Sequence, residues 1–147
     1  MCIRDRIQAV VPSMKKNGNG SIVNITTPGG KASGANTVPT SVSRAAGISL
    51  TKAISKELCE FNIRVNTVCV GLFKSGQHRK RYESRVKDEP SLTIDEFYNQ
   101  LGESVPLGKR VGEAEEAAAL ITFLSSDLSS YTTGTAVNVD GGVSPVV

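Results

Sequence analysis

Few residues of this chain belong to the types that do acid–base, nucleophilic or metal chemistry. There is one histidine, His78, and there are three cysteines, Cys2, Cys59 and Cys69, an odd number without the close pairing of a zinc site. A lone histidine in a polar segment is usually solvated, so we expect no catalytic role for His78. We expect the cysteines mostly to pack in the interior of a protein from a reducing compartment.

Charge is concentrated in one stretch. The 147 residues have a formal net charge of +3, yet residues 74–87 carry six basic side chains and one acid, so the remainder sums to −2. Basic stretches can bind nucleic acid, but only Tyr82 is interleaved as an aromatic platform, so we expect a solvated segment and no nucleic-acid partner. Attraction of an anionic substrate stays open. We interpret the paired acids Glu115 and Glu116 as a solvated helix face, with no metal site.

The composition, with 39% hydrophobic residues, indicates a folded protein with a core. No apolar run approaches the about 18 residues of a membrane span, and no secretory leader pattern is present. We therefore expect a cytoplasmic protein with no membrane partner. Residues 1–6 are charged and lead abruptly into Ile7, so we interpret them as a non-native scar before the domain at 7–147.

The hydrophobic pattern alternates short β-branched strands with helices, which is typical of a parallel α/β sheet. Strands are predicted at 21–26, 64–70 and 135–139, and helices at 7–16, at 41–60, from 93 onward and at 113–125. Pro12 predicts a kink in the first helix, and Thr93 with Glu96 forms a capping-box pattern. The polar stretch from 71 to about 90 predicts a long loop, either a lid or a disordered segment.

Several segments, in order, resemble the C-terminal half of a short-chain dehydrogenase/reductase. Residues 20–27 resemble the strand that ends in the family's catalytic serine, and residues 40–47 resemble the Tyr-x-x-x-Lys segment of the next helix. Residues 63–71 resemble the following strand and its Pro-Gly turn, and residues 106–142 resemble the closing stretch. This resemblance implies part of a doubly wound parallel (Rossmann-type) sheet, about three strands with flanking helices, and a lid at about 73–92.

The resemblance also implies hydride transfer between NAD or NADP and a small carbonyl or alcohol substrate. At the three catalytic positions stand Thr27 for serine, Thr40 for tyrosine and Arg44 for lysine. Thr27 keeps a hydroxyl, whereas Thr40 is a far weaker acid than tyrosine and is too short to reach the same point. Arg44 can bind ribose hydroxyls but stays charged, so it is a poor proton relay.

Cofactor contacts implied by the resemblance fall at Arg44, at Val70 and Gly71 after the second predicted strand, and at Ser75. Tyr82 lies in the predicted lid and is the tyrosine that could fold over the site in place of the family's catalytic tyrosine. The glycine-rich strand–turn–helix unit that holds a cofactor's pyrophosphate is absent from the sequence. We therefore expect the chain to be the C-terminal half of a domain, inactive alone. The resemblance also implies that the full-length form is a homodimer or homotetramer.

Two functions stay open. The first is an NAD(P)-dependent oxidoreductase in the full-length parent. The alternative is a dehydrogenase-fold binding or assembly module without catalysis, because Thr40 and Arg44 replace the tyrosine and the lysine.

Overall fold

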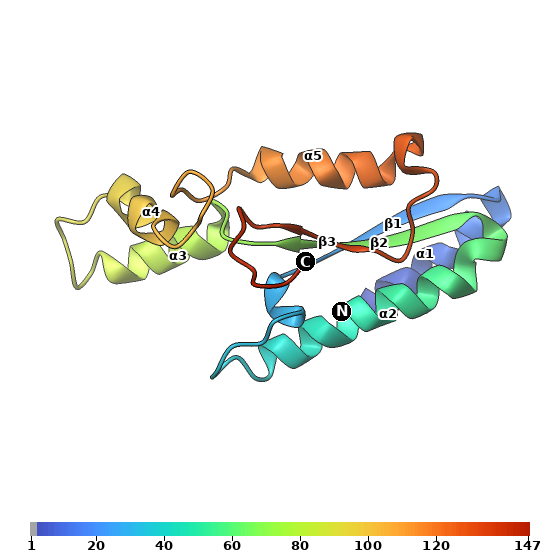
Figure 1. Cartoon of the computed structure of the whole chain (residues 1–147), viewed down its shortest axis with the longest axis horizontal. Coiled ribbons are helices and arrows are strands. Elements are labelled where there is room, and N and C mark those ends of the chain that lie inside the picture. The colour runs from blue at the N-terminus through green and yellow to red at the C-terminus, as the bar shows by residue number, and fades with distance from the viewer. Residues whose placement is uncertain (1–2) are drawn as a thin grey trace.

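A computed structural model describes residues 3–147, which form a three-stranded parallel sheet with helices on both faces (Figure 1). The helices and strands, in chain order, are α1 (Ile3–Asn17), β1 (Gly20–Thr26), α2 (Thr40–Leu58), β2 (Ile63–Val70), α3 (Gly76–Arg85), α4 (Ile94–Gly102), α5 (Ala114–Ser125) and β3 (Ala136–Val139). Helices α1 and α2 cover one face of the sheet, and α5 covers the other. The predicted α/β fold is confirmed, and no described helix is long and apolar enough to cross a membrane.

Strand β2 lies at the centre of the sheet, in the order β1-β2-β3, and pairs with both neighbours in parallel. Ile63, Val65 and Val68 are at most 1% exposed because helices pack on both faces of this strand. Ile63 and Val65 join Ile22 of β1 and Leu58 of α2 in the core cluster.

Helix α1 is longer than the predicted helix at 7–16. It begins at Ile3 and runs through Pro12 to Asn17, and Gly18, at φ +71°, terminates it. Of the six residues interpreted as a scar, Met1 and Cys2 lie outside the described residues. The other four are helical, and Ile3 packs against the core.

The prediction of a loop from 71 to about 90 was wrong, because ten residues of this stretch form α3. Helix α4 starts with the predicted capping box, in which Glu96 accepts the backbone N–H of Thr93 at 2.8 Å. The two helices pack together beyond one end of the sheet (Figure 1), where the rings of Tyr82 and Phe97 are 5.7 Å apart. The Tyr82 hydroxyl donates to the Leu92 carbonyl at 3.2 Å, away from the strand ends.

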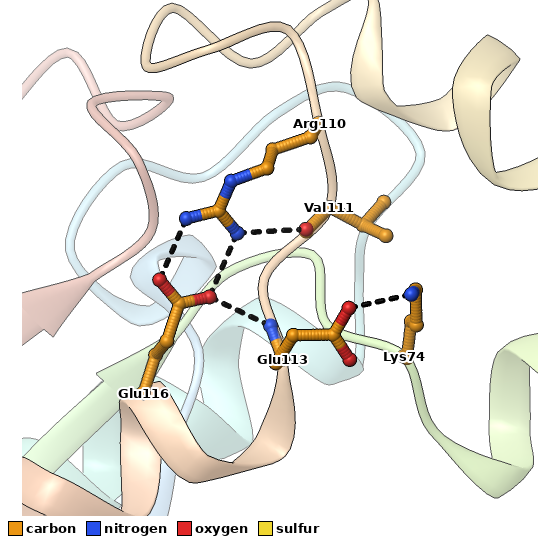
Figure 2. Close-up of polar contacts among 5 residues, drawn as sticks. All are labelled: Lys74, Arg110, Val111, Glu113 and Glu116. Carbon is orange, nitrogen blue, oxygen red and sulfur yellow. Dashed lines mark hydrogen bonds and ion pairs between the residues drawn. The ribbon is translucent and has the colours of Figure 1, made fainter.

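Ion pairs connect the two ends of the segment that contains α3 and α4 to the start of α5 (Figure 2). Arg110 donates two hydrogen bonds of 2.7 Å to Glu116, and the same carboxylate accepts the backbone N–H of Glu113 at 2.8 Å. Lys74 pairs with the Glu113 carboxylate at 2.5 Å. Glu116, interpreted from sequence as part of a solvated helix face, therefore anchors the chain that returns from α4.

Candidate active site

The carboxyl ends of the three strands meet at one edge of the sheet, where Thr27, Gly71 and Asp140 follow β1, β2 and β3. The Gly71 N–H donates to the Val139 carbonyl at 2.9 Å. A Cβ on Gly71 would lie 2.6 Å from the Asp140 Cα, so this close approach requires glycine. In open parallel sheets this edge is where ligands bind.

A cavity of about 380 Å³ lies at this edge, within the size range of small-molecule sites. Its walls come from the loops that follow the three strands, from the first two turns of α3 and from Val143–Pro145. Thr27, Val70 and Gly71 line it, so the fold brings together three of the residues singled out from the sequence.

Thr27 precedes a short 3₁₀ turn at Pro28–Gly30 and has an extended backbone. Its hydroxyl makes no hydrogen bond with any described residue, which leaves it free to bind a ligand in the cavity. The hydroxyl of the neighbouring Thr26 is buried without a partner, whereas Thr27 is partly exposed. Buried polar groups without partners are rare in folded proteins, so the Thr26 hydroxyl calls for a ligand or water to complete its bonding.

Arg44 lies on the face of α2 that packs against the sheet. It precedes Thr51 by seven residues, two helical turns, and Thr51 bonds directly to strand side chains. The Arg44 Nε is buried and has no hydrogen-bond partner. The Arg44 backbone packs tightly against Gly30, because a Cβ on Gly30 would lie 2.8 Å from the Arg44 carbonyl carbon. Arg44 therefore packs against the 3₁₀ turn that follows Thr27.

Three of the residues singled out from the sequence, Arg44, Thr40 and Ser75, do not line this cavity. Thr40 is the exposed first residue of α2. Ser75 caps the N-terminus of α3, where its hydroxyl accepts the His78 N–H at 3.4 Å.

The expectation that His78 is solvated was wrong. Its side chain lines the cavity, the residue is only 7% exposed, and its Nδ1 has no hydrogen-bond partner. Burial lowers the pKa of His78, and the nearby Arg81 charge lowers it further, so the imidazole is neutral at pH 7. A four-residue spacing of His78, Tyr82 and Val86 was the sequence signal for a helix with this face inward.

The described cysteines differ in burial. Cys69, at the end of β2, is fully buried as expected, whereas Cys59 is exposed and Cys2 lies outside the described residues. Burial raises the pKa of the Cys69 thiol, Lys31 opposes this shift, and Asp140 adds to it. The thiol therefore stays protonated and is no nucleophile.

Comparison with known proteins identifies the family of this chain. Residues 5–144 match the family model described as "Enoyl-(Acyl carrier protein) reductase". The NADPH-dependent reductase BacG of Bacillus subtilis is 37% identical over 138 residues, which are 94% of this chain and 52% of BacG. The 3-oxoacyl-[acyl-carrier-protein] reductase FabG of Thermotoga maritima is 39% identical over 136 residues, 92% of this chain and 50% of FabG.

Among solved structures, an NADPH-bound short chain oxidoreductase of Pseudomonas aeruginosa superposes with a TM-score of 0.86 at 31% identity. The match covers 99% of this chain and 54% of that protein, which is described as containing an atypical catalytic center. The chain belongs to the short-chain dehydrogenase/reductase family, as the order of its motifs predicted. It spans about half the length of the relatives that it matches.

These relatives agree with NAD or NADP as the cofactor class. The residues that line the cavity fit the nicotinamide side of such a cofactor: Thr27 offers a hydroxyl, and the strand end at Gly71 has no side chain. Arg44, whose Nε is buried without a partner, lies outside the lining of this cavity. No glycine-rich strand–turn–helix for the pyrophosphate occurs in the sequence.

Proposed function

We propose that this chain is the C-terminal half of an NAD(P)-dependent oxidoreductase that interconverts a small carbonyl compound and its alcohol. The observation that carries the proposal is the cavity at the strand ends, which combines the unpartnered Thr27 hydroxyl with an apolar floor at Val70 and Gly71. The chain's span of about half its relatives supports the assignment to one half of the domain. The assembled protein would be cytoplasmic and homo-oligomeric.

When bound, the cofactor would supply the hydride for the carbonyl carbon, and the oxygen would need a hydrogen-bond donor and a proton. Thr27 would donate a hydrogen bond to that oxygen, and solvent would supply the proton, because a threonine hydroxyl is a weak acid. Arg44 would hold the ribose hydroxyls, because its guanidinium offers five donors and its Nε lacks a protein partner. Thr40 takes no part, since it is exposed at the start of α2.

The departure from the family's tyrosine and lysine does not by itself argue against catalysis. The Pseudomonas aeruginosa relative is described both as an oxidoreductase with an atypical catalytic center and as bound to NADPH. An oxidoreductase without the usual set of side chains is therefore the first candidate for this chain.

Exposure of Thr40 outside the cavity favours a second candidate, a dehydrogenase-fold binding or assembly module that has lost hydride transfer. Such a module would still hold a dinucleotide through Arg44. It would show cofactor binding without turnover of any carbonyl substrate.

Variants of the longer protein test the first candidate against the second. Arg44→Met should weaken NADPH binding by about 10- to 100-fold in calorimetry, the equivalent of one lost charged hydrogen bond. Lys56→Met, the same charge change on an exposed position of α2, is the control and should have no effect. Thr27→Val should lower kcat by about 100-fold, whereas Thr40→Ala should leave it unchanged. Loss of turnover in Thr40→Ala would refute the assigned roles.

A further inference from the structure

Helix α3 contributes two basic side chains to the cavity, and neither has a partner among the described residues. His78 is 7% exposed with an unpartnered Nδ1, and Arg81, an exposed residue, lines the same cavity. The nearby Arg81 charge adds to the lowering of the imidazole pKa that burial causes. Other arginines of this helix are paired: Arg79 lies 3.8 Å from Glu83, and Arg85 lies 2.9 Å from Glu89.

The one acid in the cavity wall is already engaged. Asp140 accepts the Gly142 N–H at 3.0 Å through one oxygen and the Ser144 N–H at 2.9 Å through the other. No ion pair joins it to Arg81 within residues 3–147. The charged groups lining the cavity with His78 are thus a carboxylate satisfied by backbone and an unpaired guanidinium.

A further positive contribution comes from the helix itself. Gln77 and His78 are the second and third residues of the ten-residue α3, so the partly positive N-terminal end of this helix adjoins the cavity. An anion with two acceptor oxygens would complete the bonding of this wall.

We propose that the substrate is a short oxo acid or hydroxy acid whose carboxylate is bound by Arg81 and His78. A planar guanidinium matches the two oxygens of a carboxylate, and a neutral imidazole can add one N–H donor. Thr27 lines the same cavity of about 380 Å³, so the reacting carbon and the carboxylate belong to one small molecule. This inference rests on the proposed function, because the oxo group is the one that the cofactor would reduce.

His78 is the only histidine, so its imidazole C–H signals in a proton NMR spectrum are assigned without further labelling. The 147-residue chain is titrated with 2-oxobutyrate and, separately, with methyl 2-oxobutyrate, which lacks the charge. The acid should shift the His78 signals saturably, and the ester should not. Arg81→Gln should weaken acid binding by about 10- to 100-fold, the usual loss for one charged hydrogen bond.

Arg79→Gln is the matched control, since it removes the same charge from a side chain that is 70% exposed on the same helix. It should leave acid binding unchanged, and Arg81→Lys should bind the acid with intermediate affinity. Equal shifts by acid and ester, absence of a saturable shift, or equal effects of the two glutamine variants would overturn the proposal.

Turnover by the longer protein separates this inference from the proposed function. If neutral carbonyl compounds are reduced while 2-oxobutyrate neither binds nor reacts, the carboxylate site is refuted and the oxidoreductase assignment stands. If the acid binds through Arg81 but no carbonyl compound is reduced, the binding site stands and the proposed reaction is refuted.

Discussion

A buried polar network fixes α2 to the sheet and thereby positions Arg44. Asn24 of β1 donates to the Thr51 hydroxyl at 2.9 Å, and the Thr67 hydroxyl of β2 donates to the same oxygen at 2.8 Å. Thr51 and Thr67 are 1% exposed and Asn24 is 9% exposed, so water cannot replace these bonds freely. Thr51→Val nearly preserves the shape of the side chain and removes the hydroxyl, whose oxygen accepts both hydrogen bonds.

The expected cost follows from the two donors that lose their partner. Each buried group left unsatisfied costs about 1–3 kcal/mol, so Thr51→Val should lower the free energy of unfolding by about 2–6 kcal/mol. That is a large share of the about 5–15 kcal/mol that stabilises a typical domain. For a chain of this length it corresponds to a fall in Tm of about 5–20 °C.

Thermal and urea unfolding of the chain measure this effect. Thr122→Val, on an exposed position of α5, is the control and should change stability by less than about 0.5 kcal/mol. The double variant Thr51→Val/Thr67→Val should lose less stability than the sum of the losses of the two single variants. In the double variant the Thr67 hydroxyl, which Thr51→Val alone leaves without an acceptor, is absent. Equal stabilities of the Thr51 and Thr122 variants would refute the network's role.

Two further predictions concern the strand ends and the base of the helical segment. Gly71→Ala should destabilise the chain by about 1–3 kcal/mol in urea unfolding, because the new Cβ would strike the backbone that follows β3. Gly76→Ala, where nothing lies within 4 Å, is its control and should cost nothing. Hydrogen bonds from Arg110 and from the α5 N-terminus lower the pKa of Glu116 from 4.5 to about 2. A carboxylate whose pKa is lower in the folded protein stabilises the fold at pH values above its unfolded pKa, and this stabilisation is lost as the pH falls toward the folded pKa. Wild type should therefore have a higher Tm than Glu116→Gln at pH 7, and this difference in Tm should shrink as the pH falls below 4.5. A gap that does not change with pH, or one equally large for Glu115→Gln, would contradict this explanation.

Regular elements were predictable wherever local patterns determine them. The β-branched runs at 21–26 and 64–70 became strands within a residue of their predicted starts, and the Thr93–Glu96 capping box starts α4 as predicted. Helix α3 was missed because its sequence is almost entirely polar. Its inward face consists of His78 and Tyr82, and it is held by contact with Phe97, which the local sequence cannot reveal.

The candidate site was predictable only in part. Thr27, Val70 and Gly71 lie at one cavity because parallel strands end at the same edge of the sheet. The order of the motifs in the sequence already predicted parallel strands. The contributions of His78, Arg81 and Asp140 depend on how α3 and the loop after β3 fold back over that edge. The cavity brings together His78 and Asp140, which are 62 positions apart, so the local sequence carried no signal for this arrangement.

The central proposal is that this chain forms the substrate side of an oxidoreductase that works without a tyrosine at position 40. Its most direct test is transfer of deuterium from NADPH labelled at both C4 positions to a carbonyl substrate by the longer protein, with the product alcohol analysed by mass spectrometry. We predict one deuterium in the alcohol carbon, with deuterated alcohol formed about 100-fold more slowly by Thr27→Val and at the wild-type rate by Thr40→Ala. Tight NADPH binding with no deuterated alcohol from any carbonyl compound would contradict the claim and identify a binding module.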